Sequence, residues 1–145
     1  MNAVDPQQRH RSREAALQML YQAEVGKSGA FESIATYWSA RDADEALDQP
    51  LQEFANSLVH GVLSRREEID ALLVSHAQNW RLERMAVIDR LVLRLGVYEM
   101  LAEPETPSKV IINEALELAR RYSGEDAVAF VNGILDAIRK ELRRS

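Results

Sequence analysis

Three arginines and a histidine stand close together near the start of the chain, in the arginine run Arg9-His10-Arg11-Ser12-Arg13. Arg9 and Arg13 are four residues apart, so they share a face wherever this run is helical. Guanidinium groups bind phosphates through paired hydrogen bonds and stack on unpaired bases. The run therefore has the chemistry of an RNA contact. The alternative is a solvated helix start, in which the cations act mildly against the helix dipole.

A second candidate site lies near the end of the chain, where Asp126 and Phe130 are one helical turn apart after the break at Ser123-Gly124. An exposed Phe ring beside helix N-terminal amides suits a base stacked next to a phosphate. In the alternative interpretation, Asp126 caps the last helix and Phe130 belongs to the core. The sequence alone favours this alternative.

The chain offers no constellation typical of catalysis or metal binding. It has no cysteine, and its three histidines, His10, His60 and His76, lie far apart without the spacing of a zinc site. The segment Gly26-Lys27-Ser28 resembles the end of a phosphate-binding loop, but Tyr21 stands where that pattern needs a glycine. We therefore interpret this segment as a helix-terminating turn and expect no enzyme, no metal and no cofactor.

Composition and charge agree with a soluble protein that has one local basic edge. The chain has 145 residues and a formal net charge of −5, a length that suits one domain or two small subdomains. It has no run of 18 apolar residues, and residues 1–13 are polar, so we expect no membrane span, no signal peptide and a cytoplasmic location. Residues 32–53 contain six acidic residues and one arginine. The negative charge is therefore concentrated in this segment, away in sequence from the arginine run.

Apolar residues recur at helical spacing along the chain, and no segment shows the alternation of a strand. The pattern predicts an all-α protein with seven helices. The expected helices cover about residues 7–25, 31–40, 50–64, 67–75, 85–101, 107–124 and from 126 onward. An acidic linker is expected over 41–49.

The apolar positions also predict which helix faces are buried. The segment 85–101 is apolar nearly all round and is expected at the centre of a bundle. For the second helix the predicted buried stripe is Phe31, Ile34, Ala35 and Trp38. For the third helix it is Leu51, Phe54, Leu58 and Val62.

Single residues predict local details of the last two helices. Thr106 is placed as an N-cap, with Pro107 in the first helical turn. Asn113 and Asn132 lie within apolar stretches, so we expect both to be buried and hydrogen-bonded. Gly133 lies inside a helix, where glycine is unfavourable, and it therefore predicts a close helix–helix approach.

Four blocks of the chain resemble the NusB family of bacterial transcription antitermination factors. They follow in the family's order and at similar separations, and only residues 26–49 match loosely. The blocks are residues 13–21 (REAALQMLY), 88–99 (IDRLVLRLGVYE), 110–119 (VIINEALELA) and 130–136 (FVNGILD). The resemblance implies two small perpendicular helical bundles of about seven helices in one NusB-like domain. It divides that domain into an N-terminal subdomain of about 7–64 and a C-terminal subdomain of about 65–145.

The resemblance also implies a function. Members of the family bind the boxA element of ribosomal RNA leader transcripts together with NusE, a small-subunit ribosomal protein, and join elongating RNA polymerase with other Nus factors. The family's NusE-facing surface corresponds here to Asp89, with its neighbour Arg90. The family's RNA-binding positions correspond here to Arg9, His10, Arg11, Arg13, Asp126 and Phe130.

This chain departs from the family at two places. His10, largely neutral at pH 7, interrupts the arginines, and Ala127 and Ala129 stand at the last helix start, where some relatives carry a lysine. We therefore expect weaker RNA binding by the chain alone and greater reliance on NusE than in those relatives. The alternative functions are a protein-binding helical adaptor and a homodimer that buries its own RNA face. A fused RNA methyltransferase is disfavoured, because the sequence has neither a catalytic cysteine nor room for a methyl-donor domain.

Overall fold

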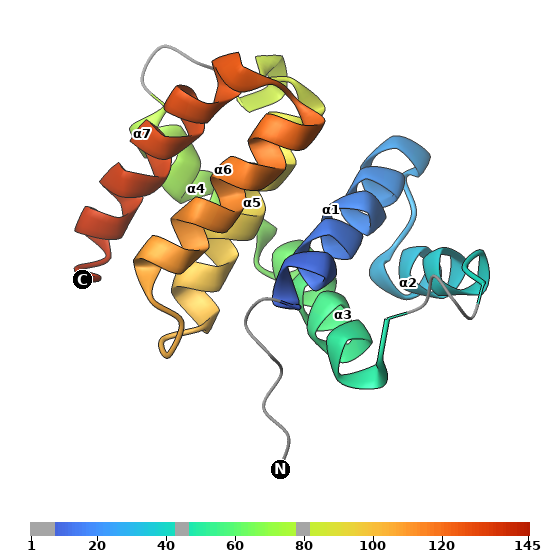
Figure 1. Ribbon diagram of the computed structural model, residues 1–145. Helices are drawn as coiled ribbons and strands as arrows, with labels where there is room; N and C mark the ends of the chain where they lie inside the picture. The colour runs from blue at the N-terminus through green and yellow to red at the C-terminus, as the bar shows by residue number, and fades with distance from the viewer. Residues whose placement is uncertain (1–7, 43–46, 78–81) are drawn as a thin grey trace. The chain divides into compact units, whose positions relative to one another are not determined.

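The computed structural model describes residues 8–42, 47–77 and 82–145, and every regular element in these ranges is a helix. The all-α prediction is confirmed. The expected helix start at residue 7 and part of the expected linker 41–49 lie outside the described residues. The elements are α1 Arg9–Gly26, α2 Ala30–Ser39, α3 Gln49–Ser64, α4 Arg66–His76, η1 Leu82–Arg84, α5 Val87–Ala102, α6 Ser108–Tyr122 and α7 Glu125–Glu141 (Figure 1).

The chain forms two compact units, residues 1–63 and residues 64–145. The first unit contains α1, α2 and α3, and the second contains η1 and the four helices from α4 to α7. None of the described helices combines the length and the apolarity that a bilayer crossing requires.

In the first unit, α3 buries the face that its spacing predicts. Leu51, Phe54, Leu58 and Val62 are all buried. At the end of α1, Lys27 is the C-cap in the left-handed region (φ 54°), and its N–H and that of Ser28 bond to the carbonyl of Ala23. The segment Gly26-Lys27-Ser28 is thus a helix-terminating turn, as expected.

The prediction for α2 is wrong for two of the four residues of its stripe, while Ile34 and Trp38 are half-buried. Phe31 is 82% exposed and Ala35 is also exposed, whereas Ser33 and Tyr37 are buried. The tyrosine hydroxyl donates a hydrogen bond of 2.9 Å to Gln18 Oε1 on α1. Because this polar group is satisfied inside the unit, the large tyrosine ring can be buried, and α2 turns a different face inward from the one its apolar stripe suggests.

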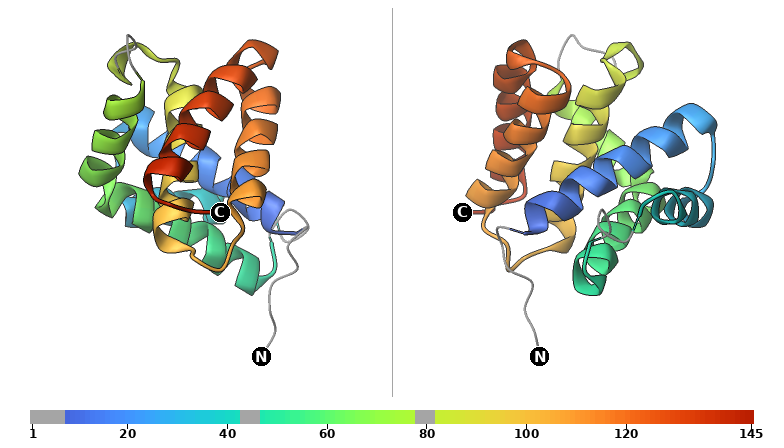
Figure 2. Two further views of the ribbon diagram at one scale, coloured as in Figure 1. Left: turned by 90° about the vertical axis from the view of Figure 1, so that its left-hand side faces the viewer. Right: turned by 45° about the vertical axis from the view of Figure 1, so that its right-hand side comes forward.

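In the second unit, α5 is the central helix. Every residue from 91 to 97 is buried, as the apolar sequence predicts. The helices α4, α6 and α7 pack around α5 (Figure 2). Arg94 is buried on α5 and donates two hydrogen bonds, of 2.8 and 3.0 Å, to the carboxylate of Asp70 on α4. This bidentate pair holds α4 against the central helix.

The close helix approach occurs at Gly96 and not at Gly133. A Cβ atom on Gly96 would lie 3.0 Å from Leu135 Cδ1, so α5 and α7 nearly touch at this point. Gly133 is exposed and has no neighbour within 4 Å of such an atom. Asn113 and Asn132 are exposed as well, contrary to prediction. These residues lie on the outer faces of α6 and α7, since their neighbours at the buried positions already fill the core.

Two predicted helix caps are also wrong. The N-cap of α6 is Pro107 and not Thr106, and its carbonyl accepts from the N–H groups of Val110 and Ile111. The N-cap of α7 is Gly124, whose φ of 150° is accessible mainly to glycine. Asp126 is therefore the second residue of α7, where its charge still favours the positive end of the helix dipole.

Candidate nucleic-acid interface

The arginine run begins α1, and its two ends meet the same aromatic ring. Arg9 Cζ lies 4.3 Å from the ring centroid of Phe54, and Arg13 Cζ lies 5.6 Å from it. Both distances are within the range of cation–π attraction. The prediction that Arg9 and Arg13 share a helix face is thus confirmed, and that face points toward α3.

Ser12 fixes how α1 lies against α3. Its hydroxyl is fully buried and donates a hydrogen bond of 2.8 Å to the carbonyl of Leu51. Leu51 stands one helical turn before Phe54 on α3. Because Ser12 lies between the two arginines and bonds next to the ring, it sets the register that brings both guanidinium groups over Phe54.

The four cationic residues differ in their exposure. Arg11 is exposed, Arg9 and His10 are half-buried, and Arg13 is only 2% exposed. His10 Nε2 lies 3.5 Å from Glu14 Oε1, one turn further along α1. The first turn of α1 contains no acidic residue. Arg9, His10 and Arg11 are therefore the accessible residues of the arginine run, which we call the cationic surface after its two arginines, and Arg13 is buried.

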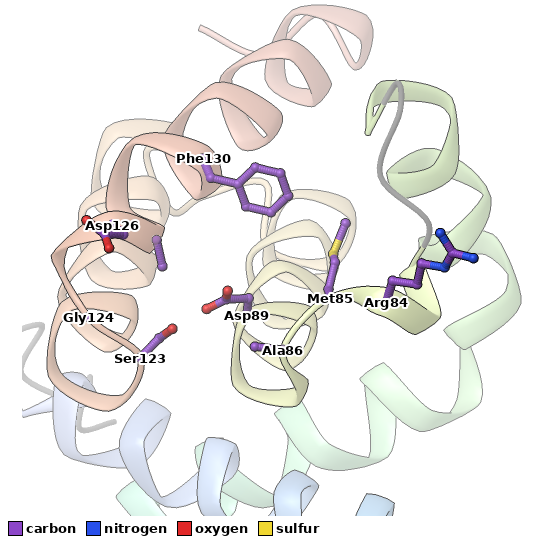
Figure 3. Close-up of a pocket in the computed structure, with 9 residues that line it drawn as sticks. Arg84, Met85, Ala86, Asp89, Ser123, Gly124, Asp126 and Phe130 are labelled. Atoms are coloured by element: carbon purple, nitrogen blue, oxygen red, sulfur yellow. The ribbon is translucent and has the colours of Figure 1, made fainter.

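The second unit contains an open cavity of about 410 Å³ beside the start of α7, which we call the α7 pocket (Figure 3). Phe130 is half-buried, and its ring points toward Met85 and Asp89 across the cavity (Figure 3). The alternative interpretation, in which Asp126 caps the last helix and Phe130 belongs to the core, is therefore wrong. Gly124 is the N-cap of α7, and the ring of Phe130 faces a cavity. The pocket is lined by Arg84, Met85, Ala86, Asp89, Ser123, Gly124, Asp126, Ala127 and Phe130.

Asp89 lies in the α7 pocket together with Asp126 and Phe130. Its Oδ1 atom is buried and accepts no hydrogen bond from any residue that the structure describes. A buried acceptor of this kind is costly unless a water molecule, a ligand or a partner supplies a donor. Its neighbour Arg90 donates a hydrogen bond of 3.1 Å from Nη1 to the carbonyl of Leu82 and so ties η1 to α5.

Sequence reasoning missed Phe54 and Met85 as members of these sites. Phe54 lies on α3, more than 40 residues after the arginine run, and its spacing marks only a core position. Met85 lies between η1 and α5, more than 40 residues before Phe130. Local periodicity carries no information about such distant pairs, so only the folded chain identifies them.

Comparison with known proteins gives the same family along nearly the whole chain. The family model described as NusB family matches residues 10–140. The transcription antitermination protein NusB of Koribacter versatilis is 46% identical over 134 residues, which cover 92% of this chain and 90% of that protein. The protein of the same name from Myxococcus xanthus is 46% identical over 136 residues, which cover 94% of this chain and 97% of that protein.

Solved structures show the same fold. The structure of T. maritima NusB has a TM-score of 0.82 and 35% sequence identity, and the match covers 97% of this chain and 94% of that one. A structure of the antitermination factors NusB and NusE in complex with dsRNA has a TM-score of 0.83 and 26% identity, with 93% of this chain and 98% of that chain covered.

Proposed function

Because the chain belongs to the NusB family, we propose that it binds boxA RNA of ribosomal RNA leader transcripts together with NusE and joins elongating RNA polymerase with other Nus factors. The members of this family are transcription antitermination proteins, which are RNA-binding regulators and not enzymes. The similarity to a NusB chain that was solved with NusE and dsRNA supports both proposed partners.

The observation that carries the proposal is the α7 pocket. The half-buried ring of Phe130 lines the pocket and offers a stacking surface for one unpaired base. Asp126 in the first turn of α7 can accept hydrogen bonds from amino or imino groups of that base.

The accessible cations of the first unit supply the phosphate contacts. Arg11 is exposed, and Arg9 is half-buried with its guanidinium on the ring of Phe54. Each arginine can bind a phosphate with two hydrogen bonds, whereas His10 contributes mainly a hydrogen bond at neutral pH. The buried Arg13 shares the ring of Phe54 with Arg9.

NusE is proposed to contact the chain through Asp89 and Arg90. Asp89 lines the α7 pocket, and its carboxylate would accept a hydrogen bond from a donor of NusE. Since Asp89 and Phe130 line one cavity, a bound NusE would border the bound base. This proximity gives a second reason to expect that RNA binding depends on the partner.

The test is a titration of a boxA RNA oligonucleotide with and without NusE at several salt concentrations. We expect NusE to tighten RNA binding, and we expect Arg9→Ala and Phe130→Ala to weaken it. Arg66→Ala, which removes an exposed arginine from α4, serves as the control and should leave the affinity unchanged. RNA binding that is equal in all these variants would contradict the proposed site.

A further inference from the structure

We propose that Phe54 is a positioning residue of the RNA-binding surface, because its ring holds the guanidinium of Arg9 in the orientation that meets RNA. This inference rests on the proposed function, since it concerns how the same cationic surface is built. Phe54 lies on α3, it is 8% exposed, and its ring is the aromatic surface on which the side chain of Arg9 rests.

The environment of Arg9 shows what holds its side chain in place. Its guanidinium makes no ion pair or hydrogen bond with any residue that the structure describes, and its Nε atom is buried. The ring of Phe54, 4.3 Å away, is therefore the contact that orders this cation. A cation held by a ring, without a carboxylate, keeps its Nη donors unpaired and so able to bind a phosphate.

A side chain of Arg9 that is already ordered in the free protein reduces the entropy cost of binding RNA. A free arginine side chain loses rotamer freedom when it contacts RNA, and a side chain that is already held loses less. Stacking on Phe54 also leaves the outer face of the planar guanidinium for a base. Without the ring, RNA binding has to order this side chain, and the rotamer cost of one arginine corresponds to about 3- to 10-fold weaker binding.

The packing of α1 against α3 fixes where Arg9 lies relative to the ring of Phe54. The buried hydrogen bond from Ser12 to the carbonyl of Leu51 holds α1 against α3. Leu51 lies one helical turn before Phe54 on α3. Arg9 lies one turn before Ser12 on α1, so the register that buries this hydroxyl also places the guanidinium on the ring.

A double-mutant cycle on RNA affinity tests the proposal. The proteins are wild type, Arg9→Ala, Phe54→Leu and the double variant, titrated with a boxA RNA oligonucleotide in the presence of NusE. We expect Phe54→Leu to weaken binding about 3- to 10-fold in the wild-type background. In the Arg9→Ala background the same change should have a much smaller effect, because only the buried Arg13 remains over the ring.

Two further variants separate positioning from general stability. Phe54→Tyr keeps an aromatic face and should retain RNA affinity close to wild type. Val62→Ala makes a small cavity at another buried position of α3 and should leave RNA affinity unchanged below its unfolding temperature. Circular dichroism confirms that each variant is folded at the temperature of the titration.

The outcomes distinguish this proposal from the proposed function. If Arg9→Ala itself leaves RNA binding unchanged, the assignment of the cationic surface to RNA fails. If Arg9→Ala weakens binding but Phe54→Leu does not, or if the two effects simply add, the positioning role of Phe54 is wrong. Equal losses in Phe54→Leu and Val62→Ala would also overturn it, since they would indicate only a loosened core.

Discussion

Gly96 on α5 lies directly against the side chain of Leu135 on α7, and a Cβ atom at Gly96 would stand 3.0 Å from Leu135 Cδ1. Leu135 is completely buried, so its side chain has little room to move aside. This contact brings α7 close to the central helix. The approach of the two helices in turn places the start of α7, with Phe130, beside Met85 and Asp89 in the pocket.

The first prediction concerns this contact. Gly96→Ala should lower the free energy of unfolding by about 1 kcal/mol. Overpacking costs roughly 1–3 kcal/mol, and about 1 kcal/mol is regained because alanine favours a helix over glycine. Urea denaturation measures the change. Adding Leu135→Val in the same protein should recover part of the loss, and a Gly96→Ala protein more stable than wild type would contradict the close approach.

Gly133 should respond in the opposite direction to the same substitution. It is an exposed helical residue of α7, and a Cβ atom there has no neighbour within 4 Å. Gly133→Ala should therefore raise the free energy of unfolding by about 0.5–1 kcal/mol, because alanine loses less backbone freedom on folding. The measurement is again urea denaturation. A destabilised Gly133→Ala protein would indicate a neighbour that the structure does not show.

The ring of Phe130 should contribute strongly to RNA affinity. Stacking of one base on an aromatic ring is worth about 1–3 kcal/mol. Phe130→Ala should therefore reduce RNA affinity at least about 5-fold, measured by fluorescence anisotropy with labelled boxA RNA. Phe31→Ala is the matched control, because Phe31 is highly exposed on α2 and lies outside the proposed site. Equal affinities of the two variants would argue against stacking at Phe130.

Salt dependence should report the phosphate contact of Arg11. For single-stranded RNA, each phosphate contact contributes about 0.7 to the slope of log affinity against log salt. Arg11→Ala should thus make this slope shallower by about 0.7, while Arg66→Ala on α4 should leave it unchanged. Titrations at four or more salt concentrations give the slope. An unaltered slope in Arg11→Ala would mean that this exposed arginine does not bind a phosphate.

Asp136 on α7 should make stability depend on acidic pH. Hydrogen bonds from Arg139, and then from Lys140, hold the pKa of Asp136 below its usual value. A lowered pKa in the folded state means that this stabilisation is present above the unfolded pKa of about 3.9 and is lost as the pH falls below it. The difference in Tm between wild type and Asp136→Asn should be constant from pH 7 to about pH 5 and shrink below about pH 4. A difference that stays constant at low pH would contradict the pairing.

The sequence determined the helices of the described chain, because the period of the apolar residues depends only on local backbone geometry. It also determined that Arg9 and Arg13 share a face, since four residues make about one turn. In α3 the predicted stripe from Leu51 to Val62 is buried as expected, because all its members are apolar and leave no competing face.

Tertiary structure decided which faces are buried and which distant side chains meet. The burial of Tyr37 in place of Phe31 depends on a hydrogen-bond partner on another helix, Gln18, and local spacing contains no trace of that partner. The difference between exposed Arg11 and buried Arg13 arises because only one of them faces the ring of Phe54. Contacts between residues far apart in the chain depend on how the helices pack. Helical periodicity therefore indicates which residues can be buried, and the packing determines which of them are buried.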